Sequence, residues 1–166
     1  MKKLILLISA FTFFLVSCGP TQNEAIAYND SLMSIVDSLI VEHNLFLDQI
    51  DGHNMDSLKI THKLFSKKAN ASLEASKKIL PFADTKEYRD VTEEYFTIIK
   101  NLAENEGKQM VDIMLIDTVQ ITQQNLDKIN EIATRFDNTY SQVYDKILAA
   151  QIKFAKDWKF ELTESK

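Results

Sequence analysis

The apolar residues between positions 126 and 154 recur in alternating steps of four and three, and this spacing constrains the fold more than any other feature of the chain. An α-helix brings residues three and four positions apart onto one face, so such a stripe predicts a long helix that packs on other helices as in a coiled coil. The stripe consists of Leu126, Ile129, Ala133, Phe136, Tyr140, Val143, Ile147, Ala150 and Phe154.

Glycine and proline, the residues that most often end helices and form turns, are scarce throughout the 166 residues. The chain has three glycines and two prolines. Two of these five lie together at Gly19-Pro20, and Gly52 and Pro81 mark two breaks further along. Few turns and helical spacing elsewhere predict long elements, and no stretch alternates as a strand does. We therefore predict an all-α fold, an up-down-up-down four-helix bundle with long antiparallel helices.

Two helices are predicted in the first half of the chain. The first covers about residues 24–50, and Thr21 and Glu24 have the spacing of a capping box at its start. The second covers about 55–80 and ends at Pro81, because proline cannot continue a helix. The residues expected to face inward are Tyr28, Leu32, Ile35, Leu39, His43, Phe46 and Ile50 on the first helix and Leu58, His62, Phe65, Ala69, Leu73, Ser76 and Leu80 on the second.

Capping spacings also suggest where the third and fourth helices begin. The third is predicted to begin after Asp84, three positions before Glu87, and the fourth near Asp117, three positions before Gln120. We expect Gly107 to kink the third helix. The fourth is the longest and is expected to project past the others. The inward residues of the third helix are expected to be Tyr88, Val91, Tyr95, Ile98, Leu102, Met110 and Ile113.

An apolar leader precedes these helices. Lys2 and Lys3 are followed by thirteen uncharged residues, 4–16, fewer than the roughly twenty apolar residues that a membrane-spanning helix needs. The sequence Leu-Val-Ser-Cys at 15–18 resembles the lipobox of bacterial lipoproteins. In that family the signal peptide is cut before the cysteine, and the cysteine, here Cys18, carries the lipid. An ordinary secretory signal or a buried N-terminal helix is the alternative interpretation.

The lipobox resemblance implies a division of the chain into a signal peptide (1–17), a lipidated tether (18–23) and a bundle domain (24–166). Cys18 is the only cysteine, so no disulfide within the chain competes for it. Acyl chains such as palmitate contribute about 0.8 kcal/mol per buried CH₂. Because Gly19 rather than Asp follows Cys18, the resemblance implies anchoring in the outer membrane, at either its periplasmic or its outer face.

The charge and the motifs disfavour several classes of function. Removing residues 1–17 would leave 17 Lys and Arg against 24 Asp and Glu, a formal charge of −7, which is unsuited to binding nucleic acid. The sequence has no Gly-rich phosphate loop, G-x-S-x-G, H-E-x-x-H or C-x-x-C-H motif. We therefore expect no catalytic residue and no cofactor, and we interpret the protein as a non-enzymatic structural or protein-interaction module of the cell envelope.

His43 and His62 are the residues that most favour ligand binding. If the first two helices turn about Gly52, residues whose numbers sum to about 105 lie level, which brings His43 beside His62. The same counting at the next turn brings His62 beside Glu104 and Asn105. Such a layer could bind a metal ion, and a small-ligand or metal-binding bundle is the alternative function. Neither histidine follows a Glu by three positions, the spacing of ferritin-like sites. The simpler interpretation is that the histidines hydrogen-bond Asn105 or one another and set the helix register, or that they lie at the edge of the stripe.

Four triplets of Asp, a hydroxyl residue and an aliphatic residue resemble the O-glycosylation site of exported Bacteroidota proteins. Their hydroxyls belong to Ser31, Ser38, Ser57 and Thr118. A competing explanation is that Asp and Ser favour helix starts.

The predicted helical body, with Tyr28-Asn29-Asp30 on its first helix, loosely resembles small all-helical surface lipoproteins of Bacteroidota and spirochaetes. That resemblance implies a location and a shape but no reaction. The expected partners are the membrane, through acylated Cys18, and an envelope protein of unknown identity. The expected contact surface is an exposed apolar patch around Phe154, Trp158 and Phe160.

Overall fold

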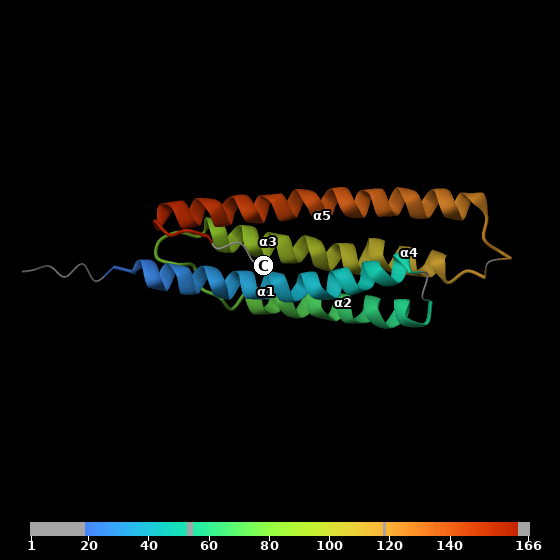
Figure 1. Cartoon of the computed structure of the whole chain (residues 1–166), viewed down its shortest axis with the longest axis horizontal. Helices are drawn as coiled ribbons and strands as arrows, with labels where there is room; N and C mark the ends of the chain where they lie inside the picture. The colour runs from blue at the N-terminus through green and yellow to red at the C-terminus, as the bar shows by residue number, and fades with distance from the viewer. Residues whose placement is uncertain (1–18, 53–54, 118, 163–166) are drawn as a thin grey trace, which may run out of the picture.

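The computed structural model describes residues 19–52, 55–117 and 119–162, and within these ranges the chain is all-helical, as predicted (Figure 1). The signal-peptide region and Cys18 lie outside the described residues. The helical elements, which lie side by side along the long axis, are α1 (Gln22–Asp51), α2 (Met55–Ser76), α3 (Glu87–Leu102), a π-helical segment (Ala103–Gly107), α4 (Lys108–Met114) and α5 (Gln123–Asp157).

Helix α1 begins at the predicted capping box. The Thr21 hydroxyl accepts a hydrogen bond from the Glu24 backbone N–H at 3.3 Å, and the Glu24 carboxylate accepts one from the Thr21 backbone N–H at 2.7 Å. The bond from the Thr21 backbone N–H, together with one that the Thr21 hydroxyl donates to the same carboxylate at 2.9 Å, lowers the pKa of the Glu24 carboxyl. Because the helix starts at Gln22, two residues earlier than predicted, only Gly19 to Thr21 separate Cys18 from the folded body.

Helix α2 ends at Ser76, four residues before its predicted end. The buried Ser76 hydroxyl donates to the Leu73 carbonyl at 2.9 Å, within the last turn. Leu80 therefore lies in the following loop and is 79% exposed, so its predicted inward position is wrong. The residue before a proline is biased away from helical backbone angles, and here Pro81 is preceded by several non-helical residues.

The third predicted helix is a continuous helical stretch built from α3, the π-helical segment and α4. Asp84 does not cap it, because the N-cap position is Lys86 and makes no side-chain capping hydrogen bond. Gly107, where a kink was predicted, is the last residue of the π-helical segment. Such a segment inserts an extra residue into the helical turn and locally changes which side chains face a neighbour.

Helix α5 begins later than predicted and is capped by a different residue. The Thr122 hydroxyl accepts from the Asn125 backbone N–H at 3.3 Å, and the Asn125 side-chain oxygen accepts from the Thr122 backbone N–H at 3.0 Å. Asp117 instead accepts from the Val119 N–H at 3.1 Å in the preceding loop. Leu126 falls in the first turn and is 41% exposed, so its predicted inward position is wrong. As predicted, this longest helix extends past α1 and α2 (Figure 1).

The core is formed where neighbouring helices pack against one another. Helix α1 packs mainly on α2, α2 on α3 and α3 on α5, while α1 and α5 approach each other less closely. Burying one large apolar side chain contributes about 1.5–3 kcal/mol. The largest fully buried side chains come from α1, α2, α3 and α5 and are Tyr95, Phe46, Phe65, Phe96, Phe136, Leu32, Leu39, Leu58, Ile99, Ile132, Ile147 and Val36.

Candidate functional site

An aromatic cluster occupies the end of the molecule where α1 begins and α5 ends. The Phe82 ring lies edge-on to Trp158 at a centroid distance of 4.8 Å, and Tyr28 lies 5.5 Å from Phe154. Phe154 is only 5% exposed, while Trp158 and Phe160 are half-buried against the core. The predicted exposed apolar patch at this end is therefore wrong, because the rings pack onto α1 and the loop before α3.

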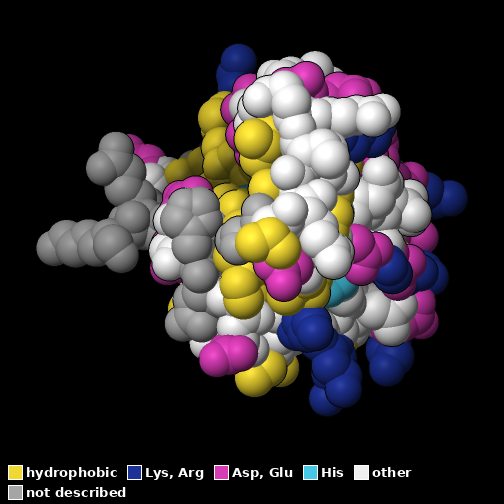
Figure 2. All heavy atoms as spheres, turned by 90° about the vertical axis from the view of Figure 1, so that its right-hand side faces the viewer, with side chains coloured by type: hydrophobic (Ala, Val, Ile, Leu, Met, Phe, Trp, Pro, Cys, Tyr) yellow, Lys and Arg dark blue, Asp and Glu magenta, His cyan; other side chains and the backbone are white. Residues whose placement is uncertain are grey.

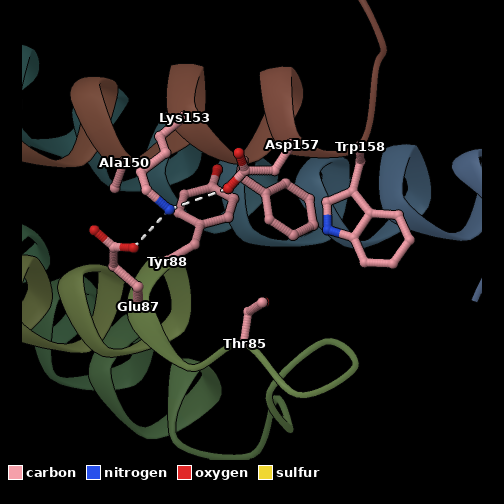
Figure 3. Close-up of a pocket in the computed structure, with 8 residues that line it drawn as sticks. Thr85, Glu87, Tyr88, Ala150, Lys153, Asp157 and Trp158 are labelled. Carbon is pink, nitrogen blue, oxygen red and sulfur yellow. Dashed lines mark hydrogen bonds and ion pairs between the residues drawn. The ribbon is translucent and has the colours of Figure 1, made fainter.

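A cavity of about 50 Å³ opens beside this cluster, between α3 and α5 (Figure 3). Lys153 crosses it, with its Nζ 2.8 Å from the Glu87 carboxylate and 3.0 Å from that of Asp157. Hydrogen bonds to Glu87 and then Asp157 raise the pKa of Lys153. The volume has room for about one or two water molecules, and organic ligands need roughly 300 Å³ or more. This cavity does not fit such a ligand.

Asn29 forms a buried polar junction between three helices, which the sequence analysis missed. Its side-chain oxygen accepts from the Tyr88 hydroxyl on α3 and from the Gln151 amide on α5, both at 3.1 Å. Burial raises the pKa of Tyr88 above its ordinary value, so the hydroxyl stays a donor. Position 29 lies four residues after buried Ala25 and three before buried Leu32. That helical spacing was the available signal for a core position.

His43 is buried among aromatic rings rather than beside a polar partner. It is 4% exposed, stacks on Tyr140 with centroids 4.2 Å apart, and lies 5.5 Å from Phe136 and 5.3 Å from Phe65. Neither ring nitrogen has a hydrogen-bond partner among the described residues. Burial lowers the pKa of His43 to about 4, so the ring is neutral at pH 7 and contacts its neighbours as an aromatic group.

His62 contacts the π-helical segment, at the level that residue counting predicted. Its Nε2 lies 2.8 Å from the Ala103 carbonyl oxygen and 3.5 Å from the Ser66 hydroxyl. A carbonyl can only accept, so Nε2 carries the hydrogen. A methyl group on buried Gly107 would lie 3.4 Å from the His62 ring, which shows how closely backbone and ring approach. The expected bond to Asn105 is replaced by one to the backbone.

The predicted polar layer of histidines and carboxylates does not form. Glu104 and Asn105 are exposed: Glu104 lies 3.7 Å from Lys100, and the Asn105 amide donates to the Asn101 carbonyl at 2.9 Å. His43 faces rings instead. Across the described parts of the chain, no three His, Cys, Asp or Glu side chains come together as a metal site.

The hydroxyls of the predicted glycosylation triplets that the structure describes all lie within helices. Ser31 is exposed and donates to the Ala27 carbonyl at 2.8 Å, and Ser38 is half-buried and donates to the Ile35 carbonyl at 2.9 Å. Ser57 is half-buried in the first turn of α2, and Thr118 lies outside the described residues. Glycosylation stays a prediction, and Ser31 is the most accessible of the described sites.

An exposed apolar patch lies instead on the outer face of α1 and α2. Val41 and Leu45 are 57% and 43% exposed on α1, and Ile60 and Leu64 are 62% and 45% exposed on α2. Each pair is spaced by four residues, so its two side chains share a helix face. We call these four residues the α1–α2 patch. This second apolar spacing, four residues apart on each helix, is the sequence signal for the patch.

The charges that surround the patch differ in sign between the two helices. Helix α1 carries six carboxylates and no Lys or Arg, whereas α2 carries four lysines and two acids. Among the described residues, none of these α1 carboxylates or α2 lysines forms an ion pair. Figure 2, which views the end with the α1–α2 turn, shows basic side chains gathered at its lower right. The lysines of α2 are Lys59, Lys63, Lys67 and Lys68.

Two further observations concern the whole described chain. None of its described helices combines the length and the apolar character needed to cross a membrane. Comparison with protein-family models, with curated proteins and with solved structures gave no match.

Proposed function

We propose that this protein is a non-enzymatic lipoprotein of the bacterial cell envelope, anchored through acylated Cys18, whose helical body docks onto a protein. The observation that carries the docking role is the α1–α2 patch. A continuous group of exposed apolar side chains, bordered by charges without ion-pair partners, is typical of a protein-interaction surface. The anchor is supported by the signal sequence and its resemblance to a lipobox.

We infer that the body is an up-down-up-down four-helix bundle in which α3, the π-helical segment and α4 act as one helix. The packing of α1 on α2, α2 on α3 and α3 on α5 supports this order. In Figure 1 the chain colour runs along α1 in one direction and back along α2 in the other, and the same is true of α3 and α5.

The position of α1 relates the anchor to the docking surface. An acyl group on Cys18 would hold the start of α1 close to the membrane, because only three residues intervene. The Gln22 side chain donates to the Lys159 carbonyl, so the end of α5 lies at the same level. At 1.5 Å per residue, Val41 lies about 30 Å further along α1. The α1–α2 patch would then stand clear of the lipid headgroups, where another protein can reach it.

The alternative function, a small-ligand or metal carrier, would use His43 and His62. Their different environments disfavour a shared ion: one is enclosed by rings and the other is bonded to a backbone carbonyl. Titrating the purified protein with Zn²⁺ or Cu²⁺ tests this alternative. Binding of one equivalent that is lost in His43→Phe and in His62→Phe would favour the carrier over the interaction module.

A labelling experiment tests the proposed anchor. Cells that express the full chain are fed an alkyne-tagged palmitate, and the protein is followed in membrane and soluble fractions. The Cys18→Ser variant should lose the label and the membrane association, because the thiol is the acylation site. The matched control Ser17→Ala keeps a small residue before the cysteine and should retain both. Label and membrane association that persist in Cys18→Ser would contradict the proposal.

A further inference from the structure

The α1–α2 patch and the charges beside it point to a second copy of this chain as the docking partner. We propose that two copies associate face to face through α1 and α2, about a two-fold axis parallel to the helices. This inference rests on the proposed interaction role and names the partner. Its residues all belong to the described part of the chain.

Ring contacts inside the molecule establish which residues of α1 and α2 lie level. His43 packs on Phe65 at 5.3 Å and Phe46 on His62 at 5.5 Å. As the residue number rises by three on α1 it falls by three on α2, so the two helices run in opposite directions. Residues whose numbers sum to about 108 therefore lie level across this pair.

By this counting the four members of the α1–α2 patch form one continuous strip. Leu45 lies level with Leu64, Val41 lies one turn further toward the start of α1, and Ile60 lies one turn toward the other end. All four lie away from the buried stripes, because their positions fall between the buried ones in the helical repeat and each side chain is exposed by more than two fifths. The strip lies near the turn that joins the two helices.

A two-fold axis parallel to the helices places α1 of each copy opposite α2 of the other. The two apolar strips then meet along their length. Asp48 of one copy comes level with Lys59 of the second, and Asp37 comes about one turn from Lys67 of the second, within reach of a lysine side chain. All four are exposed. Symmetry repeats each pair, so the surface is complementary to itself, as an isologous interface requires.

The charges exclude the other simple two-fold arrangement. An axis perpendicular to the helices would place α1 on α1, whose charged side chains beside the patch are all carboxylates, and like charges across an interface are unfavourable. The parallel axis has a second consequence. Both copies keep the start of α1 at the same end, so two acylated chains can sit in one membrane and still associate.

Zero-length cross-linking tests the geometry. Full-length acylated protein is purified in detergent in unlabelled and ¹⁵N-labelled forms, and the two are mixed, allowed to exchange and treated with a carbodiimide that joins carboxylates to lysines. We expect links from Asp48 to Lys59 and from Asp37 to Lys67 between unlabelled and labelled chains. Carboxylate–lysine links confined to single chains, or mixed-chain links at other helices only, would overturn the inference.

Variants of the patch test its energetic role. By sedimentation equilibrium in density-matched detergent, Leu45→Glu with Leu64→Glu should weaken dimerisation at least about 30-fold. The matched control is Ile152→Glu on α5, where Ile152 is 59% exposed away from the patch; it should keep the wild-type constant. Asp48→Lys should also weaken the dimer, and adding Lys59→Asp should restore it. Circular dichroism checks that each variant stays helical.

The sedimentation measurement also distinguishes a failure of the proposed dimer from a failure of the proposed lipid anchor. Wild-type protein that is acylated and membrane-bound, yet monomeric at every concentration, would overturn the self-association and leave the anchored module standing. A dimer that persists unchanged in the Leu45→Glu, Leu64→Glu variant would overturn the assigned surface. If the wild-type protein isolated from its host carries no acyl groups and still dimerises, the result supports the α1–α2 patch as the interface and contradicts the proposed anchor.

Discussion

The His43 ring on α1 lies nearly flat against the Tyr140 ring on α5, with centroids 4.2 Å apart and planes inclined by 25°. The imidazole is 4% exposed, and burial lowers the pKa of His43 to about 4. A histidine thus fills a place where an aromatic hydrocarbon would pack, and it does so only in its neutral form. The stack connects α1 and α5, which pack on each other less closely than α1 packs on α2.

Stability should therefore fall as the pH is lowered from about 6.5 to 4. The unfolded chain takes up a proton on this histidine near its ordinary pKa of 6.5, whereas the folded chain does so only near 4. More protons are bound in the unfolded state over this window, so acid favours unfolding, by roughly 3 kcal/mol once the pH is below both values. Urea unfolding at pH 7, 5.5 and 4.5 measures the loss.

The His43→Phe variant serves as the comparison for that pH dependence. Phenylalanine can fill the same ring-lined site but cannot be protonated, so the variant should lose less stability between pH 7 and pH 4.5. Carboxyl groups such as Glu24, whose pKa is lowered in the fold, contribute equally to both proteins. If the free energy of unfolding changes with pH identically in the wild type and in His43→Phe, the account of His43 is contradicted.

Removing the Asn29 side chain should destabilise the protein by about 1–3 kcal/mol, because the Tyr88 hydroxyl would lose its acceptor inside the core. Equilibrium urea denaturation of Asn29→Ala gives this value. Tyr88→Phe in both backgrounds completes a double-mutant cycle. We expect the combined loss to be smaller than the sum of the single losses. Simple additivity would show that the 3.1 Å contact contributes nothing.

Replacing Lys159 with glycine should stabilise the protein by about 1 kcal/mol, since a side chain disfavours left-handed backbone angles. Lys159 follows α5 with a φ of 58°. The Phe160 N–H bonds the Ala155 carbonyl at 3.0 Å and the Lys159 N–H bonds the Lys156 carbonyl at 3.2 Å, which is the Schellman pattern. The expected rise in Tm is about 3 °C.

The control for this substitution is Lys156→Gly, three residues earlier and inside α5. There glycine should lower the stability by about 1 kcal/mol, because it costs backbone entropy in a helix. Opposite signs for the two variants are the expected result. A loss of stability in Lys159→Gly would show that the left-handed conformation is not what limits this helix end.

The fold class could be predicted because periodicity and turn-residue scarcity report directly on helices. The capping box at Thr21 was recognised because its donor and acceptor are local in sequence. The same spacing at Asp84 and Asp117 predicted helix starts that the structure does not have. Many Asp and Ser residues are followed three positions later by a residue suited to a capping box, and tertiary packing decides which of them starts a helix. Leu80 was misplaced for the same reason: its spacing is helical, but the helix ends first.

The candidate site was less predictable because it depends on which helix faces which. Counting residues placed His62 at the π-helical segment, but it could not show that the neighbouring carbonyl of Ala103 would take the place of Asn105. The patch of Val41 and its neighbours lies on the second apolar spacing of α1. The periodicity identified the inward stripe, but only the packing of the helices shows that no other described helix covers the outward apolar residues.

The intact mass of the protein extracted from the membranes of its own host tests the central claim most directly. The account predicts the mass of the chain from Cys18 to Lys166 plus acyl groups. Additional sugar-sized increments would add glycosylation at sites such as Ser31 without altering the claim. A mass that still includes residues 1–17, or that lacks acyl groups, would contradict the proposal that this protein is a lipid-anchored module.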